Sequence, residues 1–308
     1  MDNWKSLFTT EITMNMLVSS RGIATSCDIY PTHILSDNFQ FDPKPYQNIQ
    51  FKDTVYVVTT QLREFIDRIL PTLISPFILV TGSSVLGTPK EVCQYTNINM
   101  DSLLADKRII HWFCQNNDYS HPKVSPIPLG LDFHTLENSN HWWGPQQTPT
   151  EQNKRIHEIL HTLPTTHHRP KIAYSTFHFM PNVRLEDDRN QAIDSLQNKP
   201  FVYFESNKQP REQLWKAHGE YRYILSPLGQ GIDCHRTWEA LALGSIPIVR
   251  KTTISPLFKK LPVIEINTWS EITHDFLHDQ WLLLKHHLHR KPLYLNYWVK
   301  KIKSAQKA

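Results

Sequence analysis

Cysteine is scarce in this sequence, and its few residues stand far apart. The four cysteines are Cys27, Cys93, Cys114 and Cys234, and no two of them form a C-x-x-C pair. A disulfide framework or a structural zinc site would need paired, closely spaced cysteines. The pattern therefore favours reduced thiols, which are typical of a cytosolic protein.

Long apolar runs are also missing. No stretch approaches the roughly 20 apolar residues that a membrane-spanning helix needs. The start of the chain lacks the basic segment and apolar core that mark a secretory signal peptide. We therefore predict a cytoplasmic protein without a transmembrane segment, and contact with a membrane surface stays open.

Positive charge is concentrated only in the lysine-rich end from Lys300 to Lys307, and the formal net charge is +4 with the 17 histidines neutral. Nucleic-acid-binding proteins usually carry a denser basic face, so we predict no nucleic-acid partner. Hydrophobic residues make up 40% and charged residues 20% of the chain, as in globular proteins. Because 308 residues exceed the usual size of one hydrophobic core, two domains are expected.

Short β-rich runs alternate with short amphipathic stretches along the chain. Strands are predicted over residues 55–59, 77–81, 109–113, 124–129, 171–175, 201–204, 221–225, 246–249 and 263–266. Helices are predicted over residues 61–70, 151–163, 189–196, 211–216, 280–288 and 293–302. This alternation predicts an α/β protein whose strands present ligand groups at their carboxyl ends. We place the domain boundary in the proline-bounded link at 164–170, which gives domains over 1–165 and 166–308.

The most informative stretch is SPLGQGIDCHRTWEALALGSIPIV, residues 226–249. Gly229 and Gly231 allow the backbone to turn sharply and to approach a ligand closely. A helix is predicted to begin near Asp233, a good N-cap residue, and to end at Gly244. Free N–H groups and partial positive charge gather at the start of such a helix, which predicts a phosphate site.

Polar residues cluster in the first turns of that helix. They are His235, Arg236 and Glu239, and a helix that only packs has little use for them beside a glycine loop. A purely structural strand–loop–helix unit is common in α/β proteins, but this cluster favours a binding site. The third position of the dinucleotide fingerprint G-x-G-x-x-G is Cys234 here, which argues against an NAD or FAD site and a nucleotide-dependent oxidoreductase.

Residues 226–249 resemble the C-terminal motif of the exostosin-like (family 47) inverting glycosyltransferases. A weaker similarity extends over about residues 55–270 and includes FILVTGSS at 77–84, WFCQN at 112–116 and PIPLGLD at 126–132. The resemblance implies a GT-B-like fold, two Rossmann-like domains with a cleft between them. The N-terminal domain would face the acceptor, and the C-terminal domain would hold the nucleotide-sugar donor. The terminal helices would cross back to the first domain.

The resemblance also implies where the donor binds. We predict that Arg236 binds the diphosphate and that Arg189 is a second, weaker contact to it. Glu239 is predicted to accept hydrogen bonds from the ribose hydroxyls. The other predicted donor-binding residues are Ser226, Gly229, Gly231, Asp233, His235 and Thr237. Two structural alternatives stay open, because Glu239 could pair with Arg236 at i,i+3 and Arg189 could be an ordinary surface residue.

An inverting transfer needs a base that deprotonates the acceptor hydroxyl. Asp132, at the carboxyl end of a predicted strand, is the first candidate, Asp118 is the second and Asp233 the third. Each of them could instead be a cap or turn residue. His121 and His235 are further possible bases.

We therefore predict an inverting glycosyltransferase, a hexosyl- or pentosyltransferase. It would move a sugar from a nucleoside-diphosphate sugar, with UDP favoured, to a hydroxyl of a glycan or another acceptor. No D-x-D triplet follows a predicted strand, so we predict no metal and no cofactor beyond the co-substrate. Trp142 and Trp143 could stack on a sugar or simply pack at a domain edge. The alternative function is a non-catalytic relative that binds a nucleotide or a carbohydrate.

Overall fold

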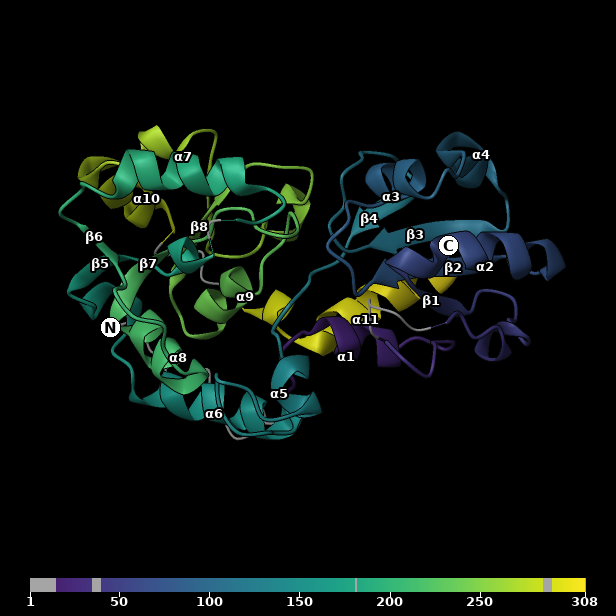
Figure 1. Cartoon of the computed structure of the whole chain (residues 1–308), viewed down its shortest axis with the longest axis horizontal. Coiled ribbons are helices and arrows are strands. Elements are labelled where there is room, and N and C mark those ends of the chain that lie inside the picture. Colours follow the sequence, from purple (N-terminus) through teal and green to yellow (C-terminus); the bar gives the residue numbers. More distant parts are fainter. Residues whose placement is uncertain (1–14, 35–39, 181, 285–289, 308) are drawn as a thin grey trace.

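A computed structural model describes residues 15–34, 40–180, 182–284 and 290–307 of the chain. Its strands form two separate sheets, and every pairing within them is parallel. Figure 1 shows the sheets side by side, each flanked by helices. The predicted α/β architecture with two Rossmann-like halves is thereby confirmed.

The first sheet has the strand order β1–β2–β3–β4. Its strands are β1 (Thr54–Val58), β2 (Phe77–Gly82), β3 (Ile109–Cys114) and β4 (Val124–Pro126). Successive side chains of a strand point to opposite faces, so Val55 and Val57 pack with one set of helices and Tyr56 and Val58 with another. The first set is α2 (Leu62–Arg68), α3 (Lys90–Tyr95) and α4 (Met100–Ala105). The second set is α1 (Ser20–Thr25) and the C-terminal helix α11 (Leu295–Ser304).

The second sheet has the order β6–β5–β7–β8–β9. Its strands are β5 (Lys171–Ser175), β6 (Val202–Phe204), β7 (Tyr221–Leu225), β8 (Ile246–Arg250) and β9 (Ile264–Ile266). One face packs against α7 (Glu186–Leu196) and α10 (His274–Leu284). The other face packs against α8 (Arg211–Glu220) and α9 (His235–Ala242). Both faces are therefore covered, as parallel sheets require.

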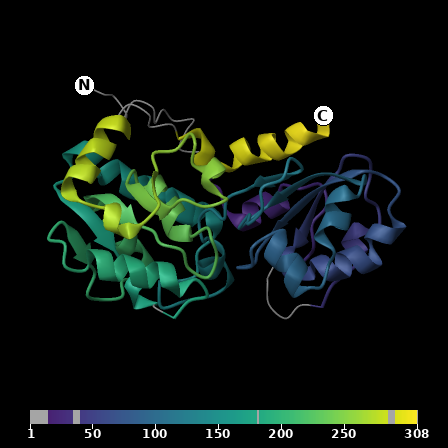
Figure 2. The same ribbon diagram turned by 90° about the horizontal axis from the view of Figure 1, so that it is seen from above.

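Helices α5 (His134–Asn138) and α6 (Pro149–Thr162) connect the two sheets, and α6 lies beside α8. Helix α11 reaches from the half that holds the second sheet to α1, as Figure 2 shows. The backbone also joins these ends, because the amide of Val18 donates to the carbonyl of Leu293 over 2.8 Å. The division of the chain at residue 165 stays a prediction.

The link before β5 is fixed by a buried arginine. Arg169 is only 1% exposed, and its guanidinium donates to the carbonyls of Pro164, Tyr221 and Leu243 and to the hydroxyl of Ser245. Burial lowers the pKa of Arg169 to about 9, so the group keeps its charge at neutral pH. These bonds tie residues 164–169 to the start of β7 and the end of α9.

The predicted strands are all present, with β4 shorter than expected because it ends at Pro126. The helix of the 226–249 stretch has Cys234 as its N-cap instead of Asp233, and Gly244 follows its end with a φ of +78°. Helix α10 begins at His274, earlier than predicted, and residues 285–288 of the predicted 280–288 helix lie outside the described residues. Within the described ranges, no helix is both long enough and apolar enough to span a bilayer.

Helices α6 and α8 approach closely at Gly219. A Cβ atom at this position would lie 2.0 Å from Cδ1 of Leu163, far inside normal contact distance. We expect Gly219→Ala to lower the free energy of unfolding by about 1–3 kcal/mol through overpacking. Urea unfolding would measure this change.

The double variant Gly219→Ala/Leu163→Ala serves as the control for this clash. Removal of the Leu163 side chain makes room for the new methyl group, so the double variant should lose less stability than the sum of the two single variants. A glycine-to-alanine change in a helix interior normally stabilises by up to about 1 kcal/mol. A stabilised Gly219→Ala protein would therefore contradict the close packing described here.

Candidate active site

A cavity of about 780 Å³ lies between the two sheets. Several of its lining residues lie in the loops that follow strands. Ser83 directly follows β2, Thr176 directly follows β5, Asn116 lies just after β3 and Gly231 lies in the loop after β7. The carboxyl ends of both sheets therefore face the same space, where open α/β sheets usually bind their ligands. We call this cavity the cleft.

The two glycines of the loop after β7 are required by close contacts. A Cβ atom at Gly229 would lie 2.6 Å from the guanidinium of Arg189, and one at Gly231 would lie 2.7 Å from Oδ1 of Asn116. Arg189 belongs to the second half of the chain and Asn116 to the first. The absence of side chains at the glycines thus lets the loop sit between the two halves.

Arg189 and Arg236 both line the cleft. Arg189 is buried, and it donates to the carbonyls of Phe177, Met180 and Leu228, so it is not the ordinary surface residue of the alternative. Arg236 donates to the hydroxyl of Ser226 over a long 3.4 Å. Burial, and after it the charge of Arg236, lowers the pKa of Arg189 to about 10. Within the described ranges neither arginine forms an ion pair, so two positive charges face the cleft uncompensated.

The start of α9 adds to this positive field. Its N-cap, Cys234, makes no side-chain capping bond, and the first two residues of the helix, His235 and Arg236, line the cleft, so the partial positive charge of this helix end lies at the cleft. Arg189, Gly231, Asp233, His235, Arg236 and Glu239 are the predicted donor-binding residues that line the cleft. The other three, Ser226, Gly229 and Thr237, are not among the cleft-lining residues of the described chain, and Ser226 and Thr237 are hydrogen-bonded to each other at 2.8 Å.

Glu239 lies on α9, largely buried, and its carboxylate accepts a hydrogen bond of 3.1 Å from the indole of Trp215. Among the described residues no ion pair joins Glu239 and Arg236, so the alternative in which Glu239 pairs with Arg236 at i,i+3 is not observed. The carboxylate is therefore held by α8 while it faces the cleft.

Asp233 joins the two halves of the site. Its carboxylate accepts hydrogen bonds from the amide of Leu129 over 2.8 Å, the amide of Cys234 over 2.9 Å and the indole of Trp238 over 2.9 Å. Its own amide donates to Asn116. Burial raises the pKa of Asp233 to about 6. Because both oxygens already accept hydrogen bonds, the arrangement favours a positioning role over that of a base.

Asp118 caps a helix of the first half. Its two oxygens accept the backbone N–H groups of Lys90 and Glu91, each over 2.8 Å, at the start of α3. Asp118 is not among the described residues that line the cleft. Its contacts are those of the cap alternative, and the structure does not bring it together with Asp132.

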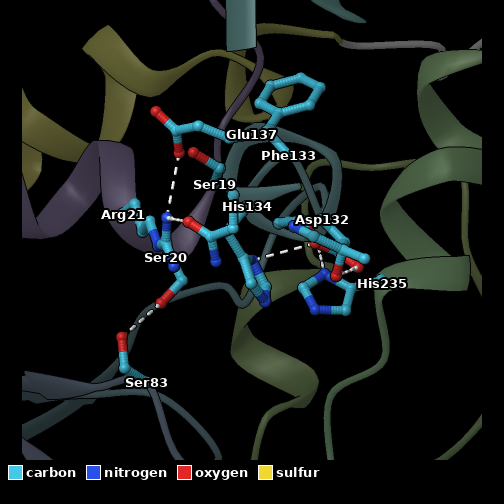
Figure 3. Close-up of polar contacts among 12 residues, drawn as sticks. Ser19, Ser20, Arg21, Ser83, Asp132, Phe133, His134, Glu137 and His235 are labelled. Carbon is cyan, nitrogen blue, oxygen red and sulfur yellow. Dashed lines mark hydrogen bonds and ion pairs between the residues drawn. The ribbon is translucent and has the colours of Figure 1, made fainter. Parts of the chain in front are cut away.

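Asp132 lies in the cleft between the rings of His134 and His235 (Figure 3). One carboxylate oxygen is 3.0 Å from Nδ1 of His134, and the other accepts hydrogen bonds from Arg211 over 3.0 Å and from the hydroxyl of Thr135 over 2.8 Å. Nδ1 of His235 lies 2.7 Å from the carbonyl of Gly130. A carbonyl or carboxylate only accepts, so each histidine donates from Nδ1.

The charges around Asp132 decide its protonation. Burial alone would raise the pKa of this carboxyl, but His235, His134 and Arg211 together hold it well below its usual range. Burial lowers the pKa of His134 to about 4, more than the Asp132 carboxylate raises it. At neutral pH the pair is thus an ionised carboxylate that orients a neutral imidazole with a free Nε2 lone pair.

His134 was not among the predicted site residues. One histidine among 17 carries little information in a sequence, and the useful signal was its place two residues after the first-choice base Asp132. The short helix α5 begins at His134, which brings the ring back onto the carboxylate.

Asp132, His134 and His235 are also the residues that could hold a metal ion. Each offers one ligand atom, and these atoms lie within 4.8 Å of one another. The guanidinium of Arg211 is bonded to the same carboxylate, and its charge opposes a cation there. The absence of a metal stays a prediction.

The fold and the site together define a two-part α/β protein with an anion-attracting cleft between two parallel sheets. No family model and no curated protein sequence matches the chain. Among solved structures, an α,α-trehalose-6-phosphate synthase from Burkholderia multivorans is similar at 10% identity and a TM-score of 0.41, over 87% of this chain and 77% of that one. A glycosyltransferase from Rickettsia africae is similar at 11% identity and a TM-score of 0.34, over 88% and 83% of the two chains.

The hydrogen bonds of the Asp233 carboxylate should contribute to the free energy of unfolding. In Asp233→Asn an amide NH₂ replaces one oxygen and meets N–H donors, so we expect a loss of about 2–3 kcal/mol in the free energy of unfolding. Urea unfolding at pH 8 would measure it, with Asp194→Asn as the control, since Asp194 is exposed on α7 and should change stability by less than about 0.5 kcal/mol. Equal stability of the two variants would show that Asp233 does not join the halves.

Proposed function

We propose that this protein is an inverting glycosyltransferase that moves a sugar from a nucleoside-diphosphate sugar to an acceptor hydroxyl. One observation carries the proposal. Two uncompensated arginines, Arg189 and Arg236, and the oriented pair Asp132–His134 line the same cleft. The first pair suits a departing diphosphate, and the second suits removal of a proton. The resemblance of residues 226–249 to the exostosin-like motif supports a UDP-linked donor.

In the proposed reaction, Nε2 of His134 takes the proton of the acceptor hydroxyl. The acceptor oxygen forms a bond to the anomeric carbon of the donor sugar from the face opposite the leaving group. The bond between that carbon and the β-phosphate oxygen breaks, and its electron pair leaves with the diphosphate. Arg236, Arg189 and the N–H groups at the start of α9 stabilise the resulting negative charge.

Donor binding would also tune the base. Besides burial, His235, Arg21 and Arg211 lower the pKa of His134. A bound diphosphate brings negative charge into the same cleft and raises that pKa, which makes His134 a stronger base when the donor is present. Asp132 is then the positioning residue, and it also stabilises the protonated imidazole.

The acceptor would enter past Trp142 and Trp143. Trp142 is 55% exposed and lines the cleft together with Trp143, whose ring lies 4.4 Å from the guanidinium of Arg211. An exposed indole at the mouth of the cleft can stack on the apolar face of a sugar ring. This supports a glycan or another hydroxyl-bearing acceptor.

Arg236 tests the donor site. We expect Arg236→Ala to weaken binding of a UDP-sugar by at least about 100-fold, to the limit of detection in calorimetry, because a charge-assisted bond to phosphate is lost in a partly buried site. Among the described residues Arg236 makes one long hydrogen bond and lies over the ring of Phe177, so the variant loses few contacts and should stay folded. Arg63→Ala, which removes an exposed arginine of α2, should bind the donor as the wild type does. Unchanged affinity in Arg236→Ala would refute the donor site.

His134 tests catalysis against the non-catalytic alternative. We expect His134→Ala to lower kcat by about 10²–10⁴-fold and to leave donor affinity within about threefold. The acid limb of kcat/KM should fall well below the ordinary histidine value of about 6.5, because burial lowers the pKa of His134 to about 4 and activity is lost only when the ring is protonated.

Three results would count against His134 as the base. His121→Ala removes another candidate base, which lies outside the cleft lining, and an equal loss of kcat there would contradict the assignment. Loss of activity on treatment with a chelator, restored by a divalent cation, would favour a metal site at Asp132, His134 and His235. Donor binding without transfer or hydrolysis in the wild-type protein would favour the non-catalytic alternative.

A further inference from the structure

Another histidine of the cleft, His218, has no hydrogen-bond partner among the described residues. His218 lies on α8, its side chain is fully buried, and neither ring nitrogen makes a hydrogen bond. An imidazole buried without hydrogen bonds costs about 1–3 kcal/mol of stability. His218 nevertheless lines the cleft, so a bound molecule could satisfy these nitrogens.

The surroundings of His218 fix its protonation state. The edge of the ring packs against Tyr174 with centroids 5.6 Å apart. Burial lowers the pKa of His218 to about 4, although the nearby Glu239 carboxylate acts in the opposite direction. The ring is therefore neutral at pH 7 and offers one N–H donor and one acceptor.

Glu239 completes the same wall of the cleft. One of its oxygens accepts the indole N–H of Trp215, and the other has capacity left for a ligand. Arg236 is also close enough to lower the pKa of His218, so this wall adjoins the place proposed for the diphosphate. A ligand group there must offer hydroxyls that donate to a carboxylate and also exchange hydrogen bonds with a neutral imidazole.

We propose that His218 binds a hydroxyl of a vicinal diol of the donor, beside the carboxylate of Glu239, to which the exostosin-like resemblance already assigns the ribose hydroxyls. Two neighbouring hydroxyls each donate and accept, which matches an acceptor-only carboxylate beside a ring that does both. The diol could belong to the ribose of the nucleotide or to the sugar that is transferred, since both are attached to the diphosphate. This inference rests on the proposed glycosyltransferase function.

The chain contains a matched control for this inference. His157 on α6 is also buried, its ring nitrogens also lack a hydrogen bond of normal geometry, and burial lowers its pKa to about 4. The backbone of Asn15 raises the pKa of His157, but by less than burial lowers it. Unlike His218, His157 is not among the described residues that line the cleft. The two histidines therefore share their burial and differ in access to the ligand.

The test compares His218→Phe with His157→Phe. Both variants remove a buried imidazole whose nitrogens lack a hydrogen bond of normal geometry, and both keep a ring, so both should melt at or above the wild-type temperature. The probe is whichever of UDP, GDP, CDP and ADP binds the wild-type protein most tightly in calorimetry. We expect His218→Phe to bind it about 10-fold more weakly, which corresponds to one ligand hydrogen bond, and His157→Phe to bind it unchanged.

Ligand analogues identify which diol is bound. If it is the ribose, the 2′-deoxy nucleotide should bind the wild type about 10-fold more weakly than the parent nucleotide, and His218→Phe should bind both nearly equally. If it is the transferred sugar, the wild type alone should prefer the nucleotide sugar over the free nucleoside diphosphate. Should His218→Phe unfold, His218→Gln, which keeps a donor and an acceptor, must retain discrimination between the analogues that His218→Leu loses.

The outcomes separate this inference from the function it rests on. Equal discrimination by His218→Phe and the wild type, with nucleotide binding intact, would overturn the role of His218 and leave the proposed function standing. A wild-type protein that binds none of the four nucleoside diphosphates would overturn the proposed function and this inference with it.

Discussion

The architecture of the site depends on the buried carboxylate of Asp233. It holds the amide of Leu129, which leads into Gly130 and Asp132, and at the same time the indole of Trp238 on α9. The segment after the first sheet and the helix after the loop of the second sheet are thus bonded to one side chain. Because a buried carboxylate must satisfy its oxygens, it fixes both segments at once. These hydrogen bonds thereby set the distance between Arg189 and Arg236 on one side and the Asp132–His134 pair on the other.

The cleft collects groups that are unfavourable for stability. Arg189 and Arg236 lie close enough to repel each other and form no ion pair among the described residues, where His218 also lacks a hydrogen bond. Elsewhere the chain satisfies comparable groups, as the carbonyls around Arg169 show. His157 is also buried without a hydrogen bond although it does not line the cleft, so the feature that favours a binding function over a purely structural one is the pair of arginines at the cleft.

The elements that could be predicted from the sequence are those with strong local signals. The buried run 77–82 forms β2, and Gly244 ends α9 in the left-handed conformation that glycine favours. Helices α1, α3, α4 and α5 were not predicted, because five or six residues are too short to display a helical period. The cap of α9 was assigned to the wrong neighbour because Asp233 is engaged by Leu129, more than a hundred residues away in sequence. Such contacts between distant segments leave no local pattern.

The position of the base shows the same limit in chemical terms. An aspartate at the end of a strand is a reasonable candidate base from sequence, but its environment decides what it can do. Three cationic or potentially cationic groups lower the pKa of Asp132, so its conjugate acid is too strong for it to accept a proton readily. The same charge makes it well suited to hold His134 in one tautomer. The residue chosen from sequence and the residue proposed from structure are therefore neighbours, with Nδ1 of His134 3.0 Å from the Asp132 carboxylate. The imidazole is assigned the proton transfer, and the carboxylate is assigned the orientation of the ring.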